Sequence, residues 1–231
     1  GGRPMKNFLT PLRFVLSFVW IFCTPSLQGQ DTILLMNPSF EDIPHRGSAG
    51  GLPIKMWDDC GFNFFPGESP PDIHPVTDDS RYGSLQPQDG STYLGLVARA
   101  NGTWESVGQM LVVPLHAGAC YSLTVMMAQS DNNKSRITVT AKKGATTVEN
   151  NFPPARILIW GGLKECERLE LLAESIDVTN HAWKAYELIL SPHDDYSHIM
   201  IEVYYSKSKK EHYNGHVLID NLSPIIAIDC K

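Results

Sequence analysis

The sequence lacks the marks of several functional classes. Its 231 residues carry a net charge of -6, and its one basic cluster, residues 207–210, is short, so it has no positive surface of the kind that binds nucleic acid. No two cysteines have the C-x-x-C spacing typical of zinc or thioredoxin chemistry. Neither a Gly-x-Ser-x-Gly elbow nor an H-E-x-x-H metal motif occurs. We therefore expect no nucleic-acid partner, and the signatures of common hydrolases are missing.

Long segments with helical periodicity are also missing. Residues 164–175 could form a short helix, but a loop followed by a strand fits them better. Elsewhere, short β-branched and aromatic runs alternate with Gly, Pro, Asn and Asp clusters, which is typical of strands joined by turns. The pattern predicts one all-β domain over residues 31–231, a β-sandwich or jelly roll. The expected strands are residues 32–35, 93–98, 104–113, 121–128, 137–141, 157–160, 169–176, 183–190, 199–205 and 217–228.

Residues 1–30 do not belong to the predicted domain. Met5, Lys6 and Arg13 precede an apolar run over residues 14–23, and a polar segment follows to residue 30. This order is typical of a secretory signal peptide, and the run is too short to stay in a bilayer as an anchor. Residues 1–4 would be a vector remnant or upstream read-through. We expect a chain that is secreted or displayed at the cell surface, with no membrane span once it is mature.

Four cysteines remain after the leader, an even number in an exported chain, so disulfides are expected. Four cysteines allow three pairings, and their spacing does not choose among them. Residues 43–92 are rich in Pro, Gly and Asp and predict a long loop, which Cys60 could tie down.

The segment 215–229 combines apolar runs with one carboxylate, Asp220. A carboxylate among apolar neighbours is costly to bury unless hydrogen bonds or a cation compensate it. Asp220 is therefore either a turn-forming residue before Ser223 and Pro224 or a metal ligand.

Two groups of residues combine a tryptophan with polar neighbours. Sugars stack their C–H faces on aromatic rings, while acids, amides and arginine bind the hydroxyl groups. Packing in the core or at a strand edge is the alternative for both tryptophans. The candidate ligand-binding residues are Trp57, Asp58, Asp59, Arg99, Trp104 and Gln109.

Catalysis is a weaker interpretation. Glycoside cleavage needs two suitably spaced carboxylates, for which Asp58, Asp59 and Glu202 are the candidates. The string His193-Asp194-Asp195 could bind a metal but fits a solvated turn better. We expect that the chain is not an enzyme.

Four segments together resemble galactose-binding-domain-like jelly rolls, the fold of many carbohydrate-binding modules. They are Asn37-Pro38-Ser39-Phe40-Glu41 and residues 118–125, 183–188 and 217–222. Residues 71–73, 89–96 and 104–109 are similar to exported jelly-roll domains of Bacteroidetes-type surface proteins. The resemblance implies a carbohydrate-binding module; a structural or adhesive domain that binds protein is the alternative, and a polysaccharide-cleaving enzyme is a more distant one.

The resemblance also implies a structural calcium ion and two disulfides. In such domains a calcium ion joins the first strand to the last, and Glu41 and Asp220 match its ligands by position, with backbone carbonyls completing the six to eight oxygens. If the strand that begins at Cys120 runs antiparallel beside the last strand, Cys120 pairs with Cys230. Cys60 then pairs with Cys166.

Overall fold

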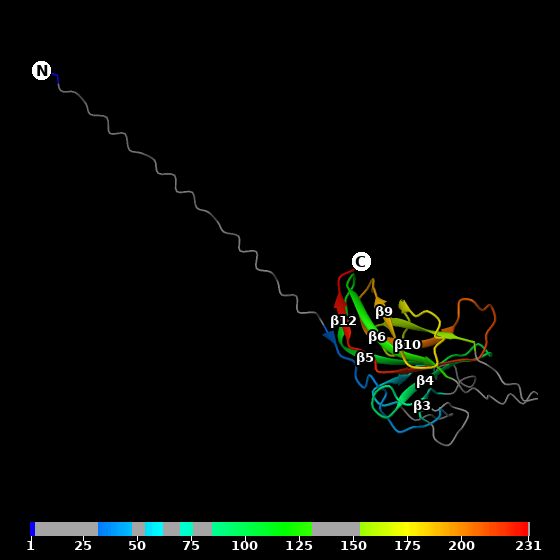
Figure 1. Ribbon diagram of the computed structural model, residues 1–231. Coiled ribbons are helices and arrows are strands. Elements are labelled where there is room, and N and C mark those ends of the chain that lie inside the picture. The colour runs from blue at the N-terminus through cyan, green and yellow to red at the C-terminus, as the bar shows by residue number, and fades with distance from the viewer. Residues whose placement is uncertain (3–31, 48–53, 62–69, 76–84, 131–152, 231) are drawn as a thin grey trace, which may run out of the picture.

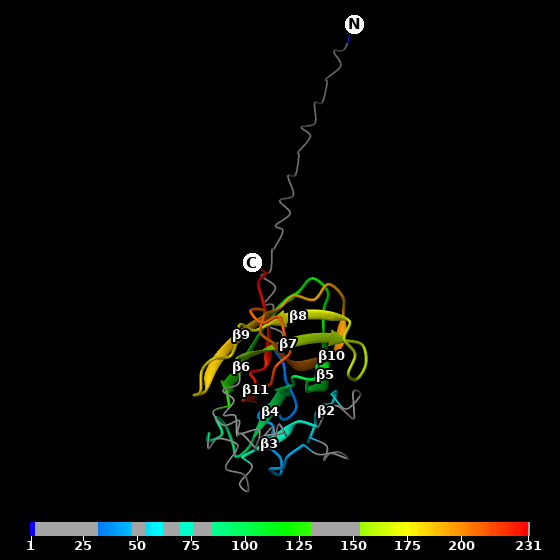
Figure 2. The same cartoon turned by 90° about the vertical axis from the view of Figure 1, so that its right-hand side faces the viewer.

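The computed structural model describes residues 1–2, 32–47, 54–61, 70–75, 85–130 and 153–230. Within these ranges all regular structure is β, arranged as a jelly-roll sandwich of two antiparallel sheets (Figures 1 and 2). The expected leader and the expected strand at 137–141 lie outside the described residues. None of the residues described forms a helix long and apolar enough to cross a membrane.

One sheet has seven strands, in the order β1-β12-β6-β11-β4-β3, with β9 also paired to β6. The first and last strands of the chain are therefore neighbours, as the jelly-roll resemblance implies. The strands β3 and β4 lie at the end of the sandwich opposite the C-terminus (Figures 1 and 2). The bounds are β1 Thr32–Ile33, β3 Asp72–His74, β4 Tyr93–Ala98, β6 Cys120–Gln129, β9 Lys184–Leu190, β11 Gly215–Asp220 and β12 Ile225–Ile228.

The second sheet has five strands, in the order β2-β5-β10-β7-β8. Its long central strand β10 pairs with β5 on one side and with β7 on the other. The bounds are β2 Asp58–Asp59, β5 Ser106–Leu115, β7 Ala155–Gly162, β8 Glu170–Glu174 and β10 Tyr196–Tyr205.

The core forms because alternate side chains of each strand point between the sheets. In β6, Tyr121, Leu123, Val125 and Met127 are buried, whereas the residues between them are partly exposed up to Met126, as the alternation predicts. The strand β9 alternates in the same way along its length. Burying these apolar faces supplies the main favourable term in folding.

The structure differs from the predicted strands in two places. Residues 217–228 form two strands, β11 and β12, because residues 221–224 interrupt the ladder. The segment 43–92, predicted as a loop, contributes the short strands β2 and β3. Its prolines concealed these strands, since a strand of two or three residues gives almost no periodic signal.

Both disulfide pairings that the resemblance implied are confirmed. Cys120 bonds Cys230, and Ile228 of β12 lies opposite Cys120 of β6 in the ladder. Cys60 bonds Cys166 and so ties the end of β2 to the turn after β7. Disulfides of this kind persist in oxidising compartments.

Candidate functional site

The outer face of the five-stranded sheet carries a group of polar and aromatic side chains. In β10, Ile199, Ile201 and Val203 point into the core. Because neighbouring residues alternate between faces, Glu202 and Tyr204 point outward. Glu202 lies opposite Ser106 of β5 and Leu158 of β7. We call this group the Glu202 cluster; its members are Trp104, Ser106, Trp160, Arg168, Glu202 and Tyr204.

Glu202 is the centre of the cluster and is only 2% exposed. Its Oε2 lies 2.6 Å from Arg168 Nη2, and Trp160 Nε1 donates a hydrogen bond to Oε1 at 3.3 Å. Burial raises the pKa of Glu202, while the charge of Arg168 and the hydrogen bonds of Trp104 and Trp160 oppose the rise. The result is a carboxyl group held in a fixed orientation beneath two partly exposed indoles.

The aromatic members hold one another in place. Trp104 packs edge-on against Tyr204, with ring centroids 5.0 Å apart. The Arg168 guanidinium lies 5.7 Å from the centre of the Trp104 ring, a favourable cation–π arrangement. Beside them Ser106 is fully buried, and its Oγ has no hydrogen-bond partner among the described residues. The cluster thus retains one buried polar group that an ordered water could satisfy.

The Cys60–Cys166 disulfide lies over this face and holds Arg168 in place. A Cβ on Gly108 of β5 would come within 2.8 Å of Cys60 Sγ, so only glycine lets the disulfide approach the sheet this closely. The turn that follows β7 contains both Cys166 and Arg168. The covalent bond therefore positions the segment that supplies the arginine.

Trp57 does not form the ligand platform that the sequence suggested. Its side chain is 3% exposed and belongs to the main core. Nε1 donates a 3.0 Å hydrogen bond to the carbonyl of Asn37, and the indole packs on Phe40 with centroids 5.0 Å apart. The packing alternative is the correct one for Trp57, because neither ring face reaches the surface.

The remaining candidates do not form one site. Asp58 is exposed, and Asp59 accepts a hydrogen bond from the Gly61 amide. Gln109 points inward and bonds the backbone of Met36 and Met56.

Arg99 pairs with the buried Glu105, outside the Glu202 cluster. Of the six candidates, only Trp104 belongs to that cluster.

From the sequence, none of Ser106, Trp160, Arg168 and Tyr204 was predicted as a ligand-binding residue. Glu202 was considered only as one of several carboxylates. One sequence signal was available. β-Branched residues recur at positions 199, 201 and 203, which places Glu202 and Tyr204 on the other face of the strand. The neighbours on β5 and β7 depend on strand register, which alternation within one strand does not give.

Glu41 and Asp220 both bind the segment just before β4, although they lie near opposite ends of the chain. Glu41 accepts hydrogen bonds from the Ser91 and Thr92 amides and from Ser91 Oγ. The fully buried Asp220 accepts from the amides of residues 88, 89 and 221. A turn-forming role and metal ligation were the two interpretations of Asp220; the structure shows it as an acceptor that ties the end of β11 to this segment.

Burial and a neighbouring carboxylate disfavour the charged form of Asp220. Burial raises the pKa of Asp220 to about 6, three backbone hydrogen bonds oppose the rise, and repulsion from Asp89 adds to it. Asp89 also repels Glu41, although the hydrogen bonds from Ser91 and Thr92 outweigh burial and leave the pKa of Glu41 lowered. Among the described residues no three His, Cys, Asp or Glu side chains are arranged as a complete metal site. A calcium ion here would need backbone carbonyls as further ligands.

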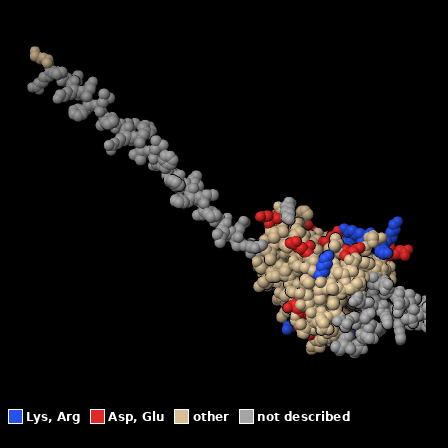
Figure 3. All heavy atoms as spheres, viewed as in Figure 1, with Lys and Arg blue, Asp and Glu red and all other residues tan. Residues whose placement is uncertain are grey.

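A charged groove lies at the end of β8, beside the start of β7 and the turn after β10. Glu174 forms ion pairs with both Arg156 and Lys207 beside the exposed Ile176. Acidic and basic side chains are interspersed along the upper part of the surface in Figure 3.

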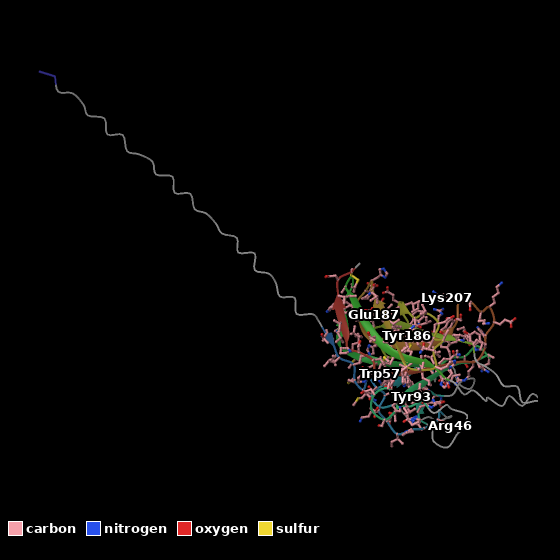
Figure 4. The ribbon with its side chains drawn as sticks, viewed as in Figure 1. Arg46, Trp57, Tyr93, Tyr186, Glu187 and Lys207 are labelled. Carbon is pink, nitrogen blue, oxygen red and sulfur yellow. A yellow bond between two sulfur atoms is a disulfide. The ribbon has the colours of Figure 1, made fainter. Side chains whose placement is uncertain are left out.

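Figure 4 places Lys207, Tyr186 and Glu187 on the upper half of the sandwich, and Trp57, Tyr93 and Arg46 on the lower half. Because the acidic and basic side chains of the groove beside β8 pair with one another, its charges do not favour a particular class of ligand.

Comparison with known proteins identifies similar folds. No known protein family and no curated protein matches the sequence. A cyclase from Fischerella sp. TAU is similar in structure, with a TM-score of 0.55 and 12% sequence identity over 87% of this chain and 98% of that one. The CBM22-1 xylan-binding domain from Paenibacillus barcinonensis Xyn10C has a TM-score of 0.43 and 13% identity over 87% and 97% of the two chains. The likeness to the cyclase shows a shared fold, the two-sheet antiparallel sandwich.

Proposed function

We propose that this chain is an exported, non-catalytic module that binds polysaccharide through the Glu202 cluster. The observation that carries the proposal is the arrangement of Trp104 and Trp160, two partly exposed indoles, on either side of a buried carboxylate and its arginine. The two disulfides support export, because such bonds form in oxidising compartments.

The chemistry of the cluster fits a sugar ring. An indole face accepts the C–H face of a pyranose, and the partly exposed Arg168 guanidinium, held in orientation by the buried Glu202, donates hydrogen bonds to its hydroxyl groups. Glu202 and Arg168 already hold each other in orientation, so less side-chain freedom is lost on binding.

Replacing Trp104 with alanine should weaken polysaccharide binding by about tenfold or more, since a stacking contact worth about 1.4 kcal/mol changes the dissociation constant tenfold. Isothermal titration calorimetry against a panel of soluble xylans, glucans, mannans and pectins would measure the loss. Trp160→Ala should have a similar effect because Trp160 contacts the same carboxylate.

Trp183 offers a matched control. It is also partly exposed, but it lies outside the cluster, packs on Tyr93 and donates to the carbonyl of Gln86. Trp183→Ala should leave the dissociation constant unchanged. Equal losses in all three variants, or no binding of any polysaccharide by the parent chain, would count against the site. Release of new reducing ends from a bound polymer would instead identify an enzyme, with Glu202 as its acid.

A protein partner is the second candidate, because apolar side chains lie on the same sheet face. Met110 and Val112 of β5 are 58% and 60% exposed. Exposed apolar side chains that gather on one face mark protein-binding surfaces. A chain that binds no polysaccharide but loses binding to a surface protein in a Met110→Ser, Val112→Ser variant would favour this function.

We also propose a structural calcium ion at Glu41 and Asp220. Calcium should raise the melting temperature of the parent chain, and a chelator should reverse the rise. A ligand that binds only the folded state stabilises that state, and more so the higher its concentration is above the dissociation constant. Asp220→Ala should abolish the calcium effect. It should also lower the free energy of unfolding by about 3 kcal/mol even in chelator, since it leaves backbone amides without an acceptor.

Asp195→Asn is the control for this experiment, because Asp195 is an exposed acid that contacts His116 and Ala117 and not the segment before β4. It should keep the full calcium response. A parent chain whose melting temperature is the same in calcium and in chelator would refute the calcium site and leave the hydrogen-bond network as the sole role of Asp220.

A further inference from the structure

Two histidines far apart in the sequence meet on the outer face of the seven-stranded sheet. His74 ends β3, and His216 lies in β11, with β4 between the two strands. Each is 1% exposed, and their ring centroids are 5.8 Å apart. Neither residue takes part in the Glu202 cluster, which lies on the other sheet.

Both rings direct the same nitrogen toward one point above Gly95. A Cβ on Gly95 would lie 2.7 Å from His216 Nε2 and 2.8 Å from His74 Nε2. The two nitrogens are therefore no farther apart than the sum of these distances. Imidazole nitrogens bind zinc at about 2.0–2.1 Å, so two ligands of one ion lie within about 4 Å of each other. Small rotations of the rings suffice to reach that separation.

A carboxylate lies beside the two nitrogens. Asp72 Oδ2 is 4.0 Å from His74 Nε2, while Oδ1 accepts a 2.6 Å hydrogen bond from the Gly47 amide. The carboxylate is thus oriented by one oxygen, and its other oxygen faces the histidine pair. Two imidazoles and one carboxylate form a ligand set that zinc and related divalent ions use.

Burial holds both imidazoles in the uncharged form. Burial, with the neighbouring charge of Arg46, lowers the pKa of His74 to about 4. Burial, with His74 and Arg99, lowers the pKa of His216 to about 3. Both rings are therefore neutral at pH 7, the form that binds metals. Arg99 also attracts the carboxyl groups of Asp72 and Glu105, whose pKa values are raised by burial.

The geometry points to a transition-metal site in which His74 and His216 bind a divalent ion through Nε2, with Asp72 as the third ligand after a small shift. Among the described residues no three His, Cys, Asp or Glu side chains stand close enough together to hold a metal as they are, so Asp72 must move toward the two imidazoles when the ion binds. Its place on the seven-stranded sheet separates it from the Glu202 cluster, which lies on the other sheet.

Titration of the chelator-treated full chain with Zn²⁺ and with Co²⁺ tests the site. One equivalent should bind, and Co²⁺ should give the visible absorption of a low-coordinate ion with nitrogen ligands. His216→Gln should weaken binding by about tenfold or more, because it removes one of two imidazole ligands. X-ray absorption of the zinc-loaded parent chain should count two imidazoles, a measurement that holds even if the variant does not fold.

The exposed histidines provide the control. His116 and His193 each lie beside a carboxylate on the surface, with side chains 60% and 90% exposed. A His116→Gln, His193→Gln variant should bind zinc as the parent does. Loss of binding in this variant but not in His216→Gln, absence of stoichiometric binding, or an imidazole count other than two would overturn the proposal.

Discussion

Replacing Trp57 with alanine should lower the free energy of unfolding by about 3–5 kcal/mol, the usual cost of removing a large buried aromatic side chain. The indole is 3% exposed and packs on Phe40. Its removal also leaves the Asn37 carbonyl without its indole donor. Urea unfolding followed by fluorescence or circular dichroism would measure the change. Because a protein of this size is stable by only about 5–15 kcal/mol, the loss is a large fraction of the total.

Trp57→Phe separates packing from ligand binding. Phenylalanine fills much of the space but donates no hydrogen bond, so the cost should fall to about 1–2 kcal/mol. The variant should bind polysaccharide as well as the parent chain does. A stable Trp57→Ala protein, or a Trp57→Phe protein that folds normally and has lost its ligand, would show that the indole acts at the surface.

The two tryptophans illustrate how far sequence reasoning reaches. Trp57 and Trp104 each stand beside polar residues, and each was a candidate for ligand binding. The difference between them lies in the tertiary structure. Trp57 precedes a strand of two residues and packs on Phe40. Trp104 precedes β5 and packs against Tyr204 on the outer face of the sheet. Neither strand register nor the position of Phe40 follows from local pattern.

Features with a strong local signal were predicted correctly. The alternation in β6 predicted its buried face, and the cysteine count predicted disulfides. The correct pairing followed from the jelly-roll resemblance, because only the fold makes β6 and β12 neighbours.

Features that depend on long-range register were missed. The strand β3 lies between prolines that indicated a loop, so nothing suggested that His74 would lie two strands away from His216. The histidines match no ligand spacing in the sequence, since 141 residues separate them in the chain. Gly95 is a further example. A side chain at this position would collide with the rings of His74 and His216, and the sequence alone does not show that these rings lie there.

Replacing Cys60 and Cys166 together with serine should lower the free energy of unfolding by about 4 kcal/mol. The bond spans 106 residues, and closing so long a loop removes much of the freedom of the unfolded chain. The same variant should weaken polysaccharide binding, because the turn that carries Arg168 is no longer fixed over Glu202. Chemical unfolding and calorimetry on one preparation would measure both effects.

The other disulfide distinguishes the two effects. Cys120 and Cys230 span 110 residues, so their replacement with serine should cost nearly the same stability. That bond joins β6 to the residues after β12 in the seven-stranded sheet, outside the Glu202 cluster. Polysaccharide affinity should therefore fall in the Cys60, Cys166 variant and remain unchanged in the Cys120, Cys230 variant, measured where both are folded. Equal affinities in the two variants would mean that Arg168 keeps its position without the covalent bond, and that the ion pair with Glu202 alone orients the site.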